Sequence, residues 1–147
     1  MTKEIINRIE VLIDNIHKLG NTCIPNHDLK IDYLTLFSKN DADYEYLQNE
    51  LKQLGNEQDA NNGKKYTLSE PLAIDNENIT LIRVRKPDIH RSEIGCCDFS
   101  HTEEIYKDIR KQALEKGWDI ILRKGYEMIE LSTFELPVYA YLVLDTD

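Results

Sequence analysis

Cysteine is scarce in this sequence, and long hydrophobic runs are absent. Two of its three cysteines, Cys96 and Cys97, are adjacent, so a framework of disulfide bonds is not expected. That usage is typical of a reducing compartment, and we expect a cytoplasmic protein. No apolar run approaches the roughly 20 residues that cross a bilayer. The amino-terminal segment alternates charged and apolar residues, which is unlike a secretory signal.

Basic residues are also in short supply. Lysine and arginine number 18 against 27 aspartates and glutamates, which gives a formal net charge of −9. An acidic surplus repels phosphate backbones and anionic lipids, so neither nucleic acid nor a membrane is an expected partner, although a local basic patch stays possible. The length of 147 residues suits one domain, and a hydrophobic content of 41% is ordinary for a globular protein.

Hydrophobic spacing divides the chain into an amino-terminal helix and two similar halves. Residues 3–18 carry isoleucine and leucine at intervals of three and four, which predicts an amphipathic helix ended by Gly20. After a connector, the first half is predicted as strand, helix and three strands, at 31–38, 38–54, 57–61, 65–69 and 79–86. The strand at 57–61 is weak because it is polar. The second half repeats this order at 93–100, 101–117, 118–124, 126–132 and 138–145.

The two halves match without a gap at an offset of 62 residues (99 − 37). The offset aligns Phe37 with Phe99, Ser38 with Ser100, Tyr44 with Tyr106, Leu47 with Ile109 and Gly55 with Gly117. Ser100 and Glu103 have the spacing of a capping box at a helix start, and Ser38 with Asp41 is its near counterpart. Internal repeats of this kind decide the architecture.

We therefore predict an α+β fold of two tandem βαβββ modules in one compact domain. Residues 1–28 form the helix and connector, 29–90 the first module and 91–147 the second. Side by side, the modules form a cupped mixed sheet with helices on its convex face, because each sheet must bury one apolar face. The concave face is then free to bind.

This element order and repeat resemble the vicinal oxygen chelate superfamily over about residues 29–147. Its members include glyoxalases, extradiol dioxygenases and methylmalonyl-CoA epimerases, and also binders that sequester antibiotics without chemistry. The resemblance implies a small-molecule site in the cup. The enzymes typically hold a divalent metal with a His on the first strand of a module and Glu or His on later strands. Here Tyr33 stands where that His is expected and its repeat equivalent is Gly95, so no metal or other cofactor is expected.

One group of residues could still hold a metal. Cys96, Cys97, Asp98 and His101 are close in sequence and are all competent zinc ligands. Neighbouring strand residues point to opposite faces, so Cys96 and Cys97 cannot both face one ion without a bulge. The favoured interpretation is that both are small core residues.

Two arginines are candidate ligand-binding residues. If Ile82 and Val84 are core, alternation turns Arg83 and Arg85 into the cup, with Ile79 on the same face. Guanidinium groups match the oxygens of a carboxylate or phosphate. The alternative is a solvated edge or a salt bridge to Glu127 or Glu130.

The later strands add aromatic and acidic candidates. Tyr139 and Tyr141 lie opposite an aliphatic face and would line the cup with aromatic walls, as would Tyr33, although aromatics are common in strands anyway. Glu130 shares its face with Met128. It could serve as a general base if burial raises its pKa, or it could be the ion-pair partner of Arg83 or Arg85.

Three functions stay open. The preferred one is a binding protein for a small anionic or aromatic compound, without metal chemistry. The second is an isomerase, lyase or dioxygenase of the same superfamily, which uses a displaced metal site or Glu130 as base. The third is a protein interaction module, in which the amino-terminal helix and the open cup bind a partner chain. A homodimer is compatible with each of them.

Overall fold

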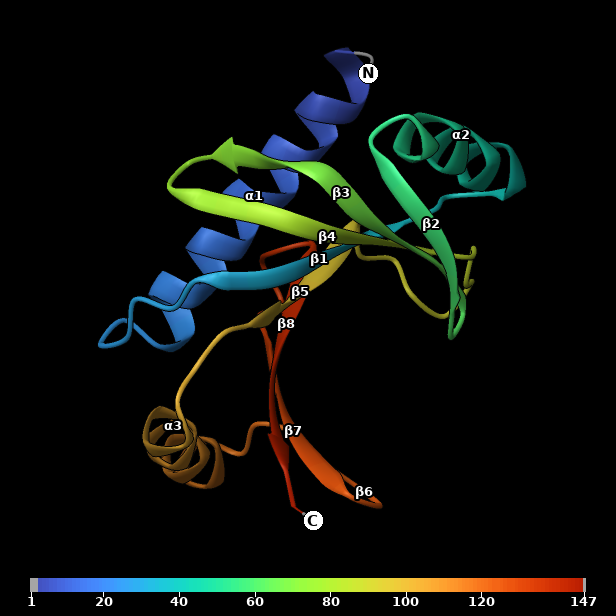
Figure 1. Cartoon of the computed structure of the whole chain (residues 1–147). Helices are drawn as coiled ribbons and strands as arrows, with labels where there is room; N and C mark the ends of the chain where they lie inside the picture. The colour runs from blue at the N-terminus through green and yellow to red at the C-terminus, as the bar shows by residue number, and fades with distance from the viewer. Residues whose placement is uncertain (1–2, 147) are drawn as a thin grey trace.

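The computed structural model describes residues 3–146 as three helices and one eight-stranded sheet (Figure 1). In chain order the elements are α1 (Lys3–Cys23), β1 (Ile31–Phe37), α2 (Asp41–Lys52), β2 (Gly55–Ala60), β3 (Gly63–Ile74), β4 (Glu77–Arg85), β5 (Gly95–Phe99), α3 (Glu103–Lys116), β6 (Ile120–Arg123), β7 (Tyr126–Ser132) and β8 (Val138–Asp145). After α1, the order strand, helix and three strands therefore occurs twice.

The strands lie in the order β2-β3-β4-β1-β5-β8-β7-β6. β1 is parallel to β4 and β5 is parallel to β8, whereas β1 and β5 are antiparallel neighbours at the middle of the sheet. Each half thus contributes four adjacent strands, and the cupped α+β fold predicted from the sequence is confirmed. The weak polar strand exists as β2, which pairs along its length with β3 and is mostly exposed.

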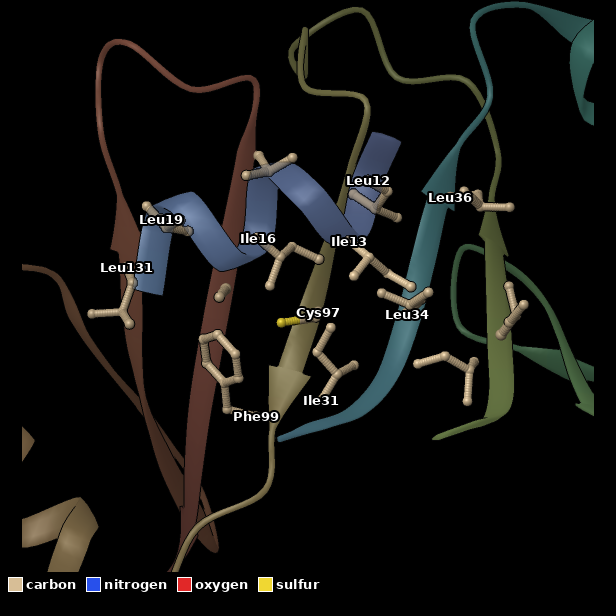
Figure 2. Packing of buried hydrophobic residues seen from close by; sticks show 14 of the residues in the cluster. Leu12, Ile13, Ile16, Leu19, Ile31, Leu34, Leu36, Cys97, Phe99 and Leu131 are labelled. Carbon is tan, nitrogen blue, oxygen red and sulfur yellow. The ribbon is translucent and has the colours of Figure 1, made fainter. Parts of the chain in front are cut away.

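All three helices cover one face of the sheet and share one core. The fully buried apolar residues of α1 are Ile5, Ile9, Leu12, Ile13, Ile16 and Leu19. Figure 2 shows the last four of these against side chains of β1 and β5. The buried residues of α2 and α3 belong to the same cluster, so both halves and α1 fold around a single core. In residues 3–146 no helix has both the length and the apolar character that crossing a membrane requires.

α1 is longer than the sequence predicts. It continues through Gly20 to Cys23, so the prediction that Gly20 ends the helix is wrong. Leu19 and Cys23 extend the apolar stripe and are buried, and this burial outweighs the low helix propensity of one glycine, about 1 kcal/mol. Gly20 also lies beside Phe99, whose ring would stand 3.8 Å from a Cβ atom at position 20.

The N-caps of α2 and α3 lie two residues after the predicted caps. The N-cap residues are Asn40 and Thr102, and each side-chain oxygen accepts a hydrogen bond from the backbone N–H three residues later. Ser38 and Ser100 instead precede the caps, and the buried Ser38 hydroxyl donates to a β4 carbonyl at 2.7 Å. The observed caps are themselves 62 residues apart (102 − 40), so they keep the predicted offset.

The two halves differ at the ends of these helices. Gly117 follows α3 in the left-handed conformation, with φ of 73°, as expected for a glycine that ends a helix. Gly55 does not end α2 in this way. α2 ends at Lys52, and Gly55 is the first residue of β2.

The prediction that Ile79, in the first part of β4, shares the face of Arg83 and Arg85 is wrong. Ile79 was expected beside Arg83, but it is fully buried in the same cluster as Ile82. The pairing of β3 with β4 shifts register around Pro71, which has no N–H to donate, and β3 is longer than the predicted 65–69. Beyond this irregularity the alternation resumes, so Arg83 and Arg85 keep the predicted side.

Candidate functional site

The sheet surface opposite the helices, here called the concave face, carries all six predicted site residues. Their strand neighbours are buried in the core beneath the helices. The six are Tyr33 on β1, Arg83 and Arg85 on β4, Glu130 on β7, and Tyr139 and Tyr141 on β8. They fall into a cationic end, a central pair and an aromatic end.

The cationic end consists of Arg83 and Lys65. These two residues are directly opposite each other on β4 and β3 and therefore share a face. Arg83 donates to the carbonyl of Asn61 at 3.1 Å, and its guanidinium lies 5.9 Å from the ring centroid of Tyr33. Within residues 3–146, no carboxylate oxygen lies within 4.0 Å of either cation. Like charges placed in this way repel each other, and a bound anion would relieve the repulsion.

The alternative of a salt bridge from an arginine of β4 to Glu127 is wrong. Glu127 lies on the helix side of the sheet and is buried. Its Oε1 accepts hydrogen bonds from Arg110 at 2.6 Å and Tyr106 at 3.0 Å. Those bonds attach α3 to β7.

The central pair is Tyr33 and Asp98, which face each other across β1 and β5. The Tyr33 hydroxyl is hydrogen-bonded to the Asp98 carboxylate. Burial, with a contribution from Asp32, raises the pKa of Asp98 to about 6 against the opposing effects of Tyr33 and Arg83. Burial and the Asp98 charge raise the pKa of Tyr33 to about 12. A carboxyl with this pKa can accept or release a proton near neutral pH.

The aromatic end is a small cluster of Phe37, Cys96 and Tyr139, with Tyr141 packed against it. The Tyr139 ring makes edge contacts with Phe37 and Tyr141, at centroid distances of 5.7 and 5.1 Å. Burial raises the pKa of both tyrosines, so their hydroxyls stay protonated and can donate. Burial also raises the pKa of Cys96 to about 11, which makes it an unreactive thiol.

Glu130, the predicted base, is already held by two groups. The Tyr141 hydroxyl donates to Glu130 Oε1 at 2.9 Å, and Arg91 Nη2 lies 3.6 Å from the same oxygen. The cationic partner of Glu130 is thus Arg91 from the β4–β5 connection, and not an arginine of β4 as predicted. Asp98 is the better-placed proton acceptor because, among residues 3–146, its hydrogen bond comes from the neutral Tyr33 hydroxyl, and the Arg83 and His101 charges act on it without an ion pair.

Two arginines frame the aromatic end. Arg85 pairs with Asp88 at 3.1 Å, reaches the Tyr139 hydroxyl at 3.4 Å and lies 5.3 Å from the Phe37 centroid. The Arg91 guanidinium lies 4.4 Å from the Tyr139 centroid, within the range of a cation–π contact. Of the two predicted arginines, Arg85 forms an ion pair, whereas Arg83 has no carboxylate oxygen within 4.0 Å in residues 3–146.

The predicted alternative of a metal cluster does not assemble. Cys96 faces the concave side, whereas Cys97 is buried in the main core on the other face. The His101 ring packs against Tyr106, with centroids 5.4 Å apart. In the part of the chain that the structure describes, no three His, Cys, Asp or Glu side chains are grouped to hold a metal ion.

Three further residues, Lys65, Asp98 and Arg91, contribute to the concave face and are not among the predicted site residues. Lys65 precedes the core residue Tyr66, and Asp98 lies two positions after Cys96, so the strand period carries a signal for both. The sequence predicts Asp98 only as a candidate metal ligand. Arg91 belongs to an irregular connection, where no period places a side chain.

Comparison with known proteins supports the fold. No family model matches the chain, and no curated protein matches its sequence. A solved structure, the structural-genomics protein EC4020, is similar with a TM-score of 0.66 and 15% sequence identity, over 96% of this chain and 86% of that chain. At this identity the likeness concerns the arrangement of helices and strands alone.

Proposed function

We propose that the concave face binds a small anionic molecule with an aromatic part, and that the protein is a vicinal oxygen chelate type binder that acts without metal chemistry. The observation that carries the proposal is the pair of Lys65 and Arg83, two opposed cations without a carboxylate within 4.0 Å in residues 3–146. The paired βαβββ order of the chain supports the proposed type.

The register of the strands places the cationic end and the aromatic end of the site in one row, so the proposed ligand needs a group for each end. Arg83 is opposite Thr35, Thr35 is opposite Cys96, and Cys96 is opposite Tyr139, so one row crosses the sheet from the cationic to the aromatic end. Three strand spacings of about 4.8 Å separate Arg83 from Tyr139, roughly 14 Å on a flat sheet and less on a cupped one. An arene that carries a carboxylate or phosphate spans this row better than a bare anion does.

Calorimetry with a matched set of probes tests the proposal. We expect 1-naphthyl phosphate to bind at least tenfold more tightly than inorganic phosphate or 1-naphthol, because only it engages both ends. Arg83→Ala and Lys65→Ala should each weaken binding about tenfold, or about 1.4 kcal/mol.

Arg123→Ala is the matched control, since Arg123 is an exposed arginine on β6. It should leave the affinity for 1-naphthyl phosphate unchanged. Equal losses in Arg83→Ala and Arg123→Ala would contradict the proposed site, as would equal binding of all three probes.

A second candidate function is acid–base catalysis on the bound anion, and the Tyr33–Asp98 pair favours it. Asp98 lies on β5 two residues from Cys96, in the row next to the one that the proposed ligand spans, and its pKa of about 6 suits proton transfer. In this function Asp98, rather than the predicted Glu130, takes the proton.

A further inference from the structure

A cavity of about 610 Å³ lies beside the aromatic end of the concave face and shares Phe37 and Arg91 with it. It is bounded by the first half of α1, by the end of β1 and by residues 86–94, which join β4 to β5. The apolar part of its lining includes Val11, Leu12, Leu36, Phe37 and Ile94. Small-molecule sites commonly have volumes of about 300 to 1,000 Å³ and a mainly apolar lining.

The basic residues Arg8 and Arg91 of the cavity wall already form ion pairs with carboxylates of this chain. Arg8 binds both carboxylate oxygens of Asp43, at 2.6 and 3.1 Å. Arg91 is shared between Glu93 at 3.8 Å and Glu130 at 3.6 Å, and both distances exceed a normal hydrogen bond. One guanidinium thus faces two carboxylates, which leaves an excess of negative charge at Glu93.

One carboxylate oxygen of Glu93 also lacks a hydrogen-bond partner in the described part of the chain. This oxygen, Oε1, is buried and accepts no hydrogen bond from any residue in the range 3–146. An unsatisfied buried acceptor is unfavourable, and a donor that enters the cavity would supply the missing bond. Three charged wall residues remain. Asp88 pairs with Arg85 of β4, and Lys39 and Glu4 are exposed and of opposite sign, so none of them cancels the excess at Glu93.

We propose that this cavity binds a small organic ammonium ion. Its apolar body packs on Val11 and Ile94, above the buried Leu12, and its ammonium group pairs with Glu93. The site is the electrostatic opposite of the concave face, where the unpaired charges are positive. Glu93 and Glu130 then each have a cation, because the ligand pairs with the former and Arg91 with the latter.

NMR of methyl-labelled protein with three matched probes tests this site. The probes are 4-phenylbutylamine, 4-phenylbutan-1-ol and 4-phenylbutyrate, which share one apolar body and differ in the end group. We expect the amine to shift the methyl resonances of Val11, Leu12 and Ile94 in a saturable way. The alcohol and the acid should bind at least tenfold more weakly.

Two variants and a control sharpen the result. Glu93→Gln should weaken amine binding about tenfold and leave alcohol binding unchanged, whereas Glu135→Gln, an exposed glutamate before β8, should change neither. Val11→Trp should fill the cavity and abolish binding, with an unchanged melting temperature to show that the fold is intact. Equal binding of amine and alcohol would overturn the proposal. So would equal effects of Glu93→Gln and Glu135→Gln, or shifts at Met128 and Val143 of the concave face in place of the cavity.

Discussion

Replacement of Ile13 by alanine is expected to lower the free energy of unfolding by about 3 kcal/mol. Ile13 lies at the centre of the apolar stripe of α1, is fully buried and packs over the middle of the sheet (Figure 2). The substitution removes the buried side-chain carbons and leaves a cavity that a rigid sheet cannot fill. Urea denaturation of the two proteins, followed by circular dichroism, measures the difference.

Val11→Ala is the control on the same helix. Val11 is 44% exposed, so its truncation should change the free energy of unfolding by no more than about 0.5 kcal/mol. A similarly small effect at Ile13 would contradict the claim that α1 is part of the hydrophobic core. It would revive the interaction hypothesis, in which α1 is available to a partner chain. The buried stripe argues against that use of α1, because the chain's own sheet already covers it.

Replacement of Asp98 by asparagine is expected to stabilise the protein by about 2 kcal/mol at pH 7.5 and to have little effect near pH 4. Burial raises the pKa of this carboxyl from an ordinary 3.8 to about 6. The folded chain therefore holds the proton more tightly than the unfolded chain between about pH 4 and pH 6. Stability falls as the pH rises through that window, and the penalty is complete above about pH 7. Two pKa units correspond to about 3 kcal/mol, of which solvent exposure removes a part.

Thermal unfolding at a series of pH values measures this difference. Asparagine cannot ionise and keeps an oxygen that can accept the Tyr33 hydroxyl, so the variant should lose the decline between about pH 4 and pH 7. Asp145→Asn, at an exposed aspartate that ends β8, should follow the original curve. Parallel curves for Asp98→Asn and the original protein would contradict the raised pKa. A gain in stability on removing Asp98 would fit a site residue retained for function at the expense of stability.

The sequence predicted the face of most site residues because strand alternation is a local rule. In β8, aliphatic residues at every second position place Tyr139 and Tyr141 together on the other side. The rule failed at Ile79, where an irregular pairing beside Pro71 changes the face. It also could not show that Gly20 stays helical, since that outcome depends on burial against the sheet.

The sequence could not predict which charged residues pair with each other. Glu130 was assigned to an arginine of β4, but its cation is Arg91, which reaches it from a connection without regular structure. A contact between residues far apart in the chain leaves no periodic pattern in the sequence from which it could be predicted. The start of α3 was mispredicted for a different reason. Ser100 and Thr102 are both good cap residues, but Thr102 is the cap, and the backbone N–H of Ser100 bonds to the Lys30 carbonyl beside β1.

An NMR titration of the protein with 1-naphthyl phosphate tests the proposed binding face most directly. Labelled arginine and lysine side chains report on the cationic end, and tyrosine ring resonances report on the aromatic end. We predict saturable shifts at Arg83 and Lys65 together with Tyr139 and Tyr141, and no shift at Arg123. Shifts confined to residues outside the concave face, or none up to millimolar ligand, would contradict the account.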